Sequence, residues 1–526
     1  MGAAAATTTA LATLGAVGPV TQALSDDAAA ELAFDAEEDC DVAVVGVGCA
    51  GISACVKAAE MGVKVVGFDR ATSVSATNAC MVVGIYGVGS AEAIGPNFTY
   101  MSSKTNYQFN NRFLRKYLEI IDDQCQRYMD KGVEMRRVES DPAKTESGLA
   151  NLQYMFVARG LDRGDQFAAM LDTYDNLTLN WETQVTKIIM EDGKAVGLLA
   201  KGSDGTVTKY NVKGGIVVCT GGFGANEEVA RARMGGAYAM ITGSIYNDGA
   251  GISMMQEAGA QLGKNFAFNA TEGGALNPKA SCGNTVMSPM YNGMLRATLM
   301  GDVLLNKRGE RFVDEAIMCK KTMMFCSEPV TREGCHFYAI MPQTEMDMLK
   351  TMTLNDFCEQ RYGFTITHGM IKKFLASNPI EHFDEDAQTA IDEGWCWKGN
   401  TFKELEEASG VPNIEATMNE YNAMCEAGED GLFFKDPAFL KPYTPDDAPF
   451  YLIECFMGQC CTQGGISTDG ACRALTPERD VIPGLYAAGM DADLESVPYI
   501  IGATCHGFSI GSGYIAAEDA AMRAMA

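Results

Sequence analysis

Basic side chains are scarce in this sequence of 526 residues, and so is histidine. Lys and Arg together number 41 against 68 Asp and Glu, which gives a net charge of −27, and the chain has 4 His. A surface this acidic repels phosphate backbones and anionic headgroups, so we exclude nucleic acid and anionic membrane surfaces as partners. Beyond residue 20, no apolar run reaches the roughly 18 residues that a transmembrane helix needs. We therefore expect no transmembrane helix there.

The 18 Cys show no metal-binding or haem-binding spacing. There is no CxxC pair, no Cys/His zinc pattern and no CxxCH, and several thiols lie in apolar runs, where cysteine packs as a small hydrophobe. We therefore expect no metal ion and mostly free thiols. One alternative stays open, an iron–sulfur cluster on four cysteines near the C-terminus: Cys455, Cys460, Cys461 and Cys472.

The first 36 residues predict a tail and linker ahead of the folded chain. Residues 1–20 (MGAAAATTTALATLGAVGPV) are apolar and uncharged, like the apolar region of an export signal, and residues 28–30 mark an expected cleavage region. No Arg pair precedes them, so a twin-arginine leader would be incomplete. We expect export to the periplasm or cell envelope, with a disordered tail on a cytoplasmic protein as the alternative. The acidic run 26–39 is predicted to be a solvated linker.

A dinucleotide-binding unit is predicted between residues 41 and 70. A β-branched run ends at GVGCAG, a helix pattern follows, and a second strand ends at Asp69. Gly46 permits a tight turn, Gly48 lets the backbone approach a pyrophosphate, and Gly51 lets helix and strand pack closely. The phosphates would lie on free N–H groups at the positive end of the helix, and Asp69 would accept hydrogen bonds from the ribose hydroxyls.

Two further stretches extend this unit. Residues 183–212 predict a β-meander with turns at Asp192-Gly193 and Asp204-Gly205. Residues 213–228 (KGGIVVCTGGFGANEE) predict another buried strand that runs into a Gly-Gly turn.

This order of elements resembles the flavoprotein family that contains fumarate reductases, succinate dehydrogenase flavoproteins, L-aspartate oxidase and 3-ketosteroid dehydrogenases. The resemblance rests on TGGFGAN (220–226), NDGAGISMMQEAGAQL (247–262), LLNKRGERFVDE (304–315) and GLYAAGMDAD (484–493), and it spans nearly everything from residue 40 onward. It implies FAD and an α/β fold, with a Rossmann-like FAD-binding domain of the glutathione-reductase type and an inserted α+β substrate-capping domain. The implied bounds are 37–265 and 445–526 for the two parts of the FAD-binding domain and 266–444 for the capping domain.

The resemblance also implies cofactor-binding positions. Val185 would lie against adenine, and Asp248 would line the same groove. Where the family has a Gly-Gly pair after the ribose acid, this chain has Ser75-Ala76-Thr77-Asn78, whose hydroxyls would have to contact phosphate or flavin. The implied positions are Gly46, Gly48, Ala50, Gly51, Asp69, Arg70, Ser75, Ala76, Thr77, Asn78, Gly84, Val185, Thr220, Gly221, Gly222, Asn226, Asp248, Gly489, Thr504, Cys505 and His506.

The cations that fumarate reductases use to hold a dicarboxylate are absent. The family's two histidine positions fall on Thr271 and Cys461, its catalytic arginine position falls on Cys319, and the segment 495–517 contains no Arg. A site without these cations cannot compensate two buried carboxylates. Fumarate, succinate and aspartate are therefore excluded as expected substrates.

The segment 495–517 instead resembles the ketosteroid dehydrogenase branch. Tyr499 falls on that branch's active-site tyrosine, and Ala503 takes the place of a glycine whose N–H binds the ring ketone with the tyrosine hydroxyl. A core role for Tyr499 is the alternative. His506 is placed near the flavin, where it would stabilise reduced flavin if protonated or simply cap the helix. Candidates for the proton donor to the substrate are Tyr246, Tyr291 and Tyr338.

We therefore expect an FAD-dependent oxidoreductase that reduces a C=C bond conjugated to a carbonyl on a bulky neutral substrate. Reductases of steroid-like lactones, such as cardiac glycoside reductase, belong to this wider group. Electrons would come from a separate cytochrome or quinone-linked donor, because the chain has no haem motif. Two alternatives remain open: a ketosteroid dehydrogenase working in the oxidative direction, and a flavin electron-transfer protein without substrate turnover.

Overall fold

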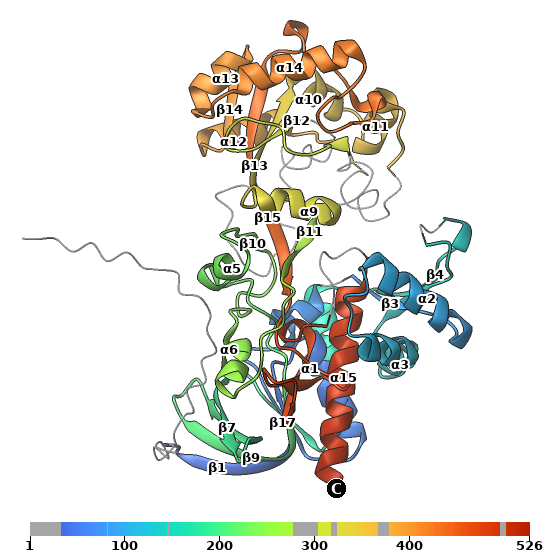
Figure 1. Ribbon diagram of the computed structural model, residues 1–526, viewed down its shortest axis with the longest axis vertical. Helices are drawn as coiled ribbons and strands as arrows, with labels where there is room; N and C mark the ends of the chain where they lie inside the picture. Colours follow the sequence, from blue (N-terminus) through green and yellow to red (C-terminus); the bar gives the residue numbers. More distant parts are fainter. Residues whose placement is uncertain are drawn as a thin grey trace, which may run out of the picture.

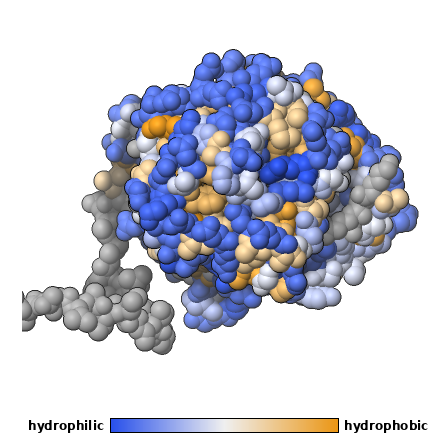
Figure 2. All heavy atoms as spheres, turned by 90° about the horizontal axis from the view of Figure 1, so that it is seen from above, coloured by the Kyte–Doolittle hydropathy of each residue, from blue (hydrophilic) through white to orange (hydrophobic). Residues whose placement is uncertain are grey.

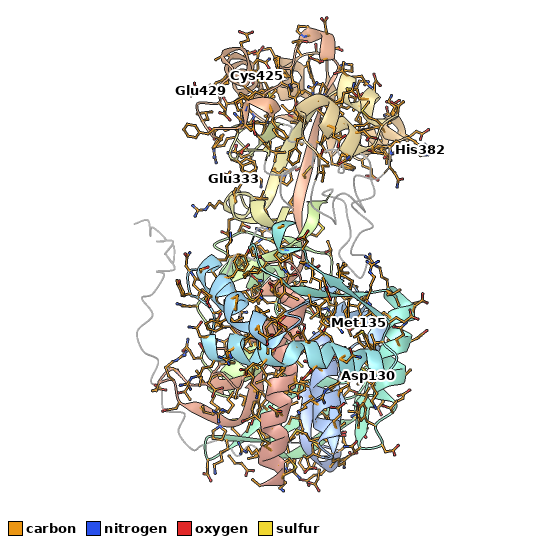
Figure 3. All side chains as sticks on the ribbon, turned by 90° about the vertical axis from the view of Figure 1, so that its right-hand side faces the viewer. Asp130, Met135, Glu333, His382, Cys425 and Glu429 are labelled. Atoms are coloured by element: carbon orange, nitrogen blue, oxygen red, sulfur yellow. The ribbon has the colours of Figure 1, made fainter. Side chains whose placement is uncertain are left out.

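A computed structural model describes residues 33–81, 83–144, 147–276, 303–316, 323–366, 378–494 and 501–526. These residues form two lobes joined by long strands, with the C-terminus in the lower lobe (Figure 1). From the side, Asp130 and Met135 lie in the lower lobe, His382 and Cys425 in the upper lobe, and Glu333 between them (Figure 3).

The lower lobe is built on a mostly parallel sheet with the order β16-β17-β9-β1-β2-β6. β1 lies between β2 and β9 and is parallel to both, with Val44 opposite Gly67 and Val217. All of β2 and the end of β1 are buried, because a parallel sheet is covered on both faces. This confirms the predicted α/β class with a parallel sheet. The strands are β1 (Ala36–Val45), β2 (Val65–Phe68), β6 (Leu177–Asn180), β9 (Val207–Val218), β16 (Arg473–Leu475) and β17 (Val481–Ala487).

Two antiparallel strands extend β9 as the predicted meander. β7 (Gln184–Glu191) pairs with β8 (Lys194–Lys201), and β8 pairs with β9. Asp192 and Gly193, at the first turn, both have positive φ, 48° and 73°, which is the backbone of a tight hairpin turn.

Small residues let the last helix pack closely. α15 (Thr504–Met525) lies beside α1 (Cys49–Glu60) against the sheet (Figure 1). A Cβ at Gly513 would overlap the Ala50 carbonyl oxygen, and a Cβ at Gly507 would overlap the Tyr117 hydroxyl of α3. The other helices of this lobe are α2 (Ala91–Lys104), α3 (Asn111–Asp130), α4 (Gly160–Leu171), α5 (Glu227–Arg233) and α6 (Ala250–Glu257).

The first strand and a small third sheet complete the lower lobe. β1 begins at Ala36, so the prediction of a linker up to residue 39 is wrong at its end: Glu37 stands opposite Lys209 in the ladder, and their side chains pair at 2.8 Å. The side chains there stay exposed, which explains why the run reads as solvated. The third sheet has the order β3-β5-β4, with β3 (Gly84–Gly87), β4 (Met135–Glu139) and β5 (Leu152–Phe156).

The second sheet runs from the upper lobe toward the lower one. Its central strand β15 pairs with β13 at the upper end, Phe456 opposite His336, and with β11 at the lower end, Cys461 opposite Asn269. β15 belongs to this sheet along its whole length, and the chain next joins the parallel sheet at β16. The strands are β10 (Met240–Ile241), β11 (Ala267–Leu276), β12 (Val303–Leu305), β13 (His336–Pro342), β14 (Cys396–Gly399) and β15 (Phe450–Gln463).

Helices surround this sheet at its upper end. Thr401 caps α13 by accepting a hydrogen bond from the Glu404 N–H, at 3.1 Å. Seen from above, this end is mainly hydrophilic with scattered apolar residues (Figure 2). None of the helices described is both long and apolar enough to cross a membrane. The helices are α9 (Met323–Arg332), α10 (Gln343–Leu349), α11 (Leu354–Tyr362), α12 (Phe383–Asp392), α13 (Phe402–Ser409) and α14 (Ile414–Ala427).

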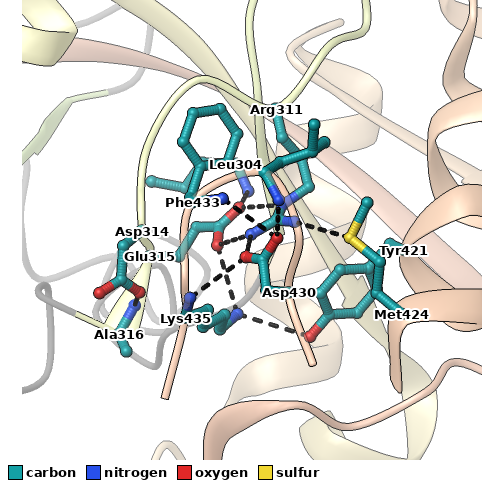
Figure 4. A network of polar contacts seen from close by, with 11 residues as sticks. Leu304, Arg311, Asp314, Glu315, Ala316, Tyr421, Met424, Asp430, Phe433 and Lys435 are labelled. Carbon is teal, nitrogen blue, oxygen red and sulfur yellow. Dashed lines mark hydrogen bonds and ion pairs between the residues drawn. The ribbon is translucent and has the colours of Figure 1, made fainter. Parts of the chain in front are cut away.

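A buried network of charges holds the upper lobe together (Figure 4). Arg311 donates two hydrogen bonds to Glu315 and one to Asp430, all at 2.8 Å. Lys435 Nζ lies 3.4 Å from Glu315, and the side chains of all four residues are at most 1% exposed. Two positive and two negative side chains therefore compensate one another out of contact with water.

Candidate active site

The three glycines between β1 and α1 have different surroundings. Gly46 has φ 95°, and a Cβ there would lie 2.5 Å from the Cys219 carbonyl oxygen, while a Cβ at Gly51 would overlap the Gly46 carbonyl oxygen. A Cβ at Gly48 would meet nothing nearer than Thr77 Cβ, at 4.0 Å. The protein's own backbone thus requires the first and third glycines, whereas the space beside Gly48 is open. Such a cradle fits the pyrophosphate of a dinucleotide.

The start of α1 is also suited to an anion. Gly48 is its N-cap residue and supplies no side-chain hydrogen bond. The first N–H groups of a helix have no intrahelical acceptor and carry the positive end of its dipole. An anion beside Gly48 would supply the missing acceptors.

Asp69 lies against this loop at the end of β2. Its Oδ2 accepts a hydrogen bond from the Val47 N–H at 2.7 Å, and its Oδ1 accepts one from Ala71 at 2.8 Å. Burial raises the pKa of Asp69 even though these N–H groups act to lower it. One pocket brings together most of the positions expected to hold adenosine: Gly46, Asp69, Arg70, Val185 and Thr220.

Tyr246, a candidate proton donor to the substrate, lines the same pocket, and its role as a donor stays a prediction. Arg70 donates to the Tyr246 carbonyl oxygen at 2.5 Å and to Asp248 Oδ2 at 2.8 Å, and its guanidinium lies 5.7 Å from the Tyr246 ring centre. These contacts hold the Tyr246 backbone and ring beside Arg70. Asp248, another expected position of the groove, forms an ion pair with Arg70 at 2.8 Å.

Asp491 fixes the Gly-Gly turn that follows β9. It accepts hydrogen bonds from the Thr220 N–H at 2.5 Å, the Thr220 hydroxyl at 2.8 Å and the Gly222 N–H at 2.8 Å. Its side chain is fully buried, and burial raises its pKa. Gly221 and Gly222 have φ 101° and 83°, which only glycine adopts readily. The sequence pattern gave Asp491 no role, although it follows a buried strand much as Asp69 does.

We expect Asp491→Asn to lower stability by about 2 kcal/mol and to weaken FAD binding about tenfold, because the amide nitrogen would face a backbone or hydroxyl donor. Thermal unfolding with and without FAD, and a fluorescence titration of the apoprotein, would measure both effects. Asp493→Asn is the matched control, since that carboxylate accepts only longer hydrogen bonds from Lys264 and Asn265, at 3.2 and 3.4 Å. Equal behaviour of the two variants would contradict the role of Asp491.

The segment in place of the family's Gly-Gly pair is largely occupied by contacts within the protein. Asn78 donates to the Cys460 carbonyl oxygen at 3.1 Å and accepts from the Ser244 N–H at 2.7 Å. Thr77 is buried next to Gly48, on the side where a cofactor would bind. Ser75 and Ala76 form a single 3-10 turn before it.

Three further positions expected to bind the cofactor have different surroundings. Gly489 lies beside the glycine-rich loop, because a Cβ there would be 3.1 Å from Ala50 Cβ. Asn226 instead caps α5, and its Oδ1 accepts a hydrogen bond from the Val229 N–H at 3.1 Å. Gly84 is the first residue of β3.

His506 is buried and neutral. Its ring stacks on Phe156, with ring centres 5.3 Å apart. Burial and the nearby Arg163 guanidinium lower the pKa of His506 to about 3, which favours the neutral ring and so counts against the alternative in which a protonated His506 stabilises reduced flavin. Arg163 itself donates to the carbonyl oxygens of Ala79 and Ala158, at 3.1 and 2.7 Å.

Ala503 has a left-handed backbone, which glycine adopts more readily than alanine. Its φ of 67° and ψ of 2° lie in the left-handed region, which costs a residue with a Cβ about 1 kcal/mol or more. The Ala503 carbonyl oxygen accepts hydrogen bonds from the Tyr86 N–H at 3.1 Å and the Gly507 N–H at 3.3 Å. Thr504 donates to the Ile501 carbonyl oxygen at 2.7 Å.

Three thiols and an amide meet beside this turn. Cys461 Sγ lies 3.5 Å from Cys505 Sγ and 3.9 Å from Cys460 Sγ, and Asn269 Nδ2 lies 3.5 Å from Cys461 Sγ. Cys461 stands where the resemblance implies a carboxylate-binding histidine. This part of the site is therefore neutral and polarisable; we name these four residues the thiol cluster.

The alternative of an iron–sulfur cluster on four cysteines is wrong on geometry. Cys455 precedes Cys461 by six residues on β15, which is about 20 Å at the rise of a β-strand. Cys455 Sγ donates instead to the Ile453 carbonyl oxygen, at 3.7 Å. Within the described ranges, no three Cys, His, Asp or Glu side chains are placed to hold a metal ion.

Tyr338 is likewise too distant to serve the same site. It stands opposite Glu454, seven residues from Cys461, or about 23 Å along β15. Burial raises its pKa to about 12. The other proposed proton donor, Tyr291, and the proposed catalytic Tyr499 lie outside the described residues.

Comparison with known proteins gives several matches. Residues 41–512 match the family model described as FAD binding domain. NADH:acrylate oxidoreductase of Vibrio harveyi is 30% identical over 324 residues, which are 59% of this chain and 27% of that protein. The chain thus spans about a quarter of that relative's length. Vinyl phenol reductase of Lactiplantibacillus plantarum is 24% identical over 501 residues, 91% of this chain and 96% of that protein.

The fold is shared with a solved flavoenzyme. The crystal structure of 3-ketosteroid delta1-dehydrogenase from Sterolibacterium denitrificans, in complex with 1,4-androstadiene-3,17-dione, has a TM-score of 0.68. The alignment covers 92% of this chain and all of that one, at 16% identity.

Proposed function

The chain belongs to the FAD binding domain family, and from that membership we propose that it is an ene-reductase for bulky neutral substrates. It is an FAD-dependent oxidoreductase whose relatives act on carbon–carbon double bonds. The proposal adds that the double bond is conjugated to a carbonyl, on a steroid-like or similarly large molecule. It also adds that a separate cytochrome or quinone-linked protein supplies the electrons.

The neutral thiol cluster is the observation that carries this proposal. Asn269, Cys461 and Cys505 offer an amide and thiols where a dicarboxylate would need cations. A buried carboxylate without a cation costs several kcal/mol, whereas a ketone requires only hydrogen-bond donors.

The relatives support a neutral substrate to different degrees. The Lactiplantibacillus protein, which aligns over almost its whole length, is named for vinyl phenol, an uncharged molecule with a C=C bond. The Vibrio protein is named for acrylate, a carboxylate, but the alignment covers only 27% of it.

The first turn of α15 would supply the donors for the carbonyl. Ala503 precedes this helix, so its N–H lies at the positive end of the dipole. With the Tyr499 hydroxyl it would stabilise negative charge that develops on the carbonyl oxygen. Bound FAD supplies hydride to the carbon at the far end of the conjugated system.

Anaerobic reduction of the FAD-loaded protein followed by a substrate panel tests the function. Reoxidation by neutral enones supports the ene-reductase. Reduction of the oxidised protein by saturated 3-ketosteroids, with no reoxidation by enones, would show a dehydrogenase working in the opposite direction. A protein that exchanges electrons with mediators but reacts with neither class would be an electron carrier.

We expect Tyr499→Phe to lower the rate of enone reduction at least about tenfold while FAD stays bound, because one oxyanion donor is lost. The measurement is single-turnover reoxidation of the reduced variant, with the visible spectrum of FAD as the control for binding. An unchanged rate would remove Tyr499 from the mechanism.

A further inference from the structure

The thiol cluster contains a pair of sulfurs in contact across two elements that are distant in sequence. Cys461 lies within β15, opposite Asn269 in the ladder, and Cys505 lies in the first turn of the 22-residue helix α15. Their Sγ atoms are 3.5 Å apart, whereas a disulfide needs about 2.05 Å. Side-chain rotation with a small shift of the helix start would close this gap.

Exposure differs between the two thiols in a way that suits stepwise oxidation. Cys461 is buried, while Cys505 and Cys460 are half-buried. The contacts to Cys460 and Cys505, together with burial, raise the pKa of Cys461 well above its usual value. An oxidant would therefore react with Cys505 first, and Cys461 would react in the second step.

We propose that Cys461 and Cys505 form a thiol–disulfide modification site that reacts with a low-molecular-weight disulfide and closes to an intramolecular bridge. The Cys505 thiolate attacks the disulfide RSSR, which releases one RS⁻ and leaves Cys505 bonded to SR. Cys461 then loses its proton and attacks the Cys505 sulfur, which releases the second RS⁻. Two protein thiols lose two electrons and two protons, and RSSR becomes two RSH.

Tryptic mapping of the full-length, FAD-loaded protein tests the bridge. The protein is incubated with oxidised glutathione, its remaining thiols are alkylated, and the digest is analysed by mass spectrometry. Peptide 480–523 contains one cysteine, Cys505, whereas peptide 436–473 contains Cys455, Cys460, Cys461 and Cys472. We expect the two peptides joined, two hydrogen masses below their sum, and separated again by dithiothreitol.

Single variants identify the partner in the bridge. Cys461→Ser should abolish the joined peptides, while Cys460→Ser should retain them. Cys425→Ser, which removes a half-buried thiol of α14, is the matched control and should also retain them. Joined peptides in Cys461→Ser, or Cys505 recovered only alkylated or as a mixed disulfide, would overturn the proposal.

The bridge would join β15 to the turn at Ala503, and this consequence rests on the proposed function. Oxidation should slow reoxidation of the reduced protein by an enone at least about tenfold, and dithiothreitol should restore the rate, because a linked turn cannot adjust to the substrate. Cys505→Ser should not respond to oxidation, because it can form neither the mixed disulfide nor the bridge. The peptide experiment uses no enone, so it tests the thiol site even where the substrate class is wrong. A bridge that leaves the rate unchanged would overturn the control of turnover.

Discussion

Gly48→Ala is expected to leave the protein folded and to weaken FAD binding at least about a hundredfold. A Cβ at this position would meet no protein atom nearer than 4.0 Å, and the backbone has φ −87°, which alanine accepts. The methyl group would instead fill the cradle at the start of α1 and push away the phosphate. Loss of one or two charge-assisted hydrogen bonds, each worth about 1.5–3 kcal/mol, gives this factor. Titration of the apoprotein with FAD measures it.

Two other glycines serve as controls for this result. Gly95→Ala also places a Cβ in open space, but on the exposed helix α2, so both folding and FAD binding should match the wild type. Gly51→Ala should lower the stability of the apoprotein itself, because its Cβ would overlap the Gly46 carbonyl oxygen. Wild-type FAD affinity in Gly48→Ala would contradict the placement of the pyrophosphate.

Arg311→Met is expected to destabilise the protein by about 3–5 kcal/mol, because it leaves two buried carboxylates with one remaining cation. Glu315 and Asp430 would lose three hydrogen bonds of 2.8 Å. They would keep hydrogen bonds from backbone N–H groups, and Lys435, 3.4 Å from Glu315, would be the cation left in the network. Chemical denaturation, followed by circular dichroism, measures the free energy of unfolding.

A surface pair provides the matched control for the buried network. Arg115→Met removes the ion pair between Arg115 and Glu119, which are also four residues apart in sequence but are exposed. This substitution should lower the free energy of unfolding by about 0.5 kcal/mol or less. Adding Glu315→Gln to Arg311→Met should recover part of the loss, because one unpaired charge disappears. Equal effects of the two Arg variants would contradict a structural role for the network.

The same network predicts a dependence of stability on pH. Burial alone would raise the pKa of Asp430, but hydrogen bonds from Arg311 and from the amides of Leu432 and Phe433 lower it to about 2. A carboxyl group in the unfolded chain titrates at about pH 4. The contribution of Asp430 to the free energy of unfolding is therefore fully present above that pH. It is lost as the pH falls toward 2, and the loss should be absent in Arg311→Met.

The parallel unit could be predicted from sequence because its signals are local. The strand that ends at Gly46, the helix pattern after Gly51 and the strand before Asp69 follow one another within 30 residues, and the structure has them in that order. The long strand β15 could not be bounded in this way. Its partners, β10, β11, β13 and β14, lie about 50 to 220 residues away, and the sequence before residue 463 gives no sign of where pairing stops.

The candidate site shows the same difference between local and long-range signals. Positions within a loop, such as Gly46 and Gly48, were predictable, because turn geometry depends on neighbouring residues. The surroundings of Tyr246 and Tyr338 could not be predicted in this way. The fold alone places Tyr246 in the pocket with Asp69, and Tyr338 far from Cys461 along β15. The charge of His506 depends on Phe156 and Arg163, which no spacing in the sequence connects to it.

A pair of substrates with the same skeleton, one neutral and one anionic, tests the central claim most directly. The FAD-loaded protein is reduced anaerobically and mixed with 4-phenylbut-3-en-2-one or with cinnamate, which have the same skeleton but end in a methyl ketone or a carboxylate. We expect the ketone to reoxidise the flavin at least about a hundredfold faster, because the thiol cluster offers no cation to a buried carboxylate. Equal or faster reoxidation by cinnamate would contradict an ene-reductase built for neutral substrates.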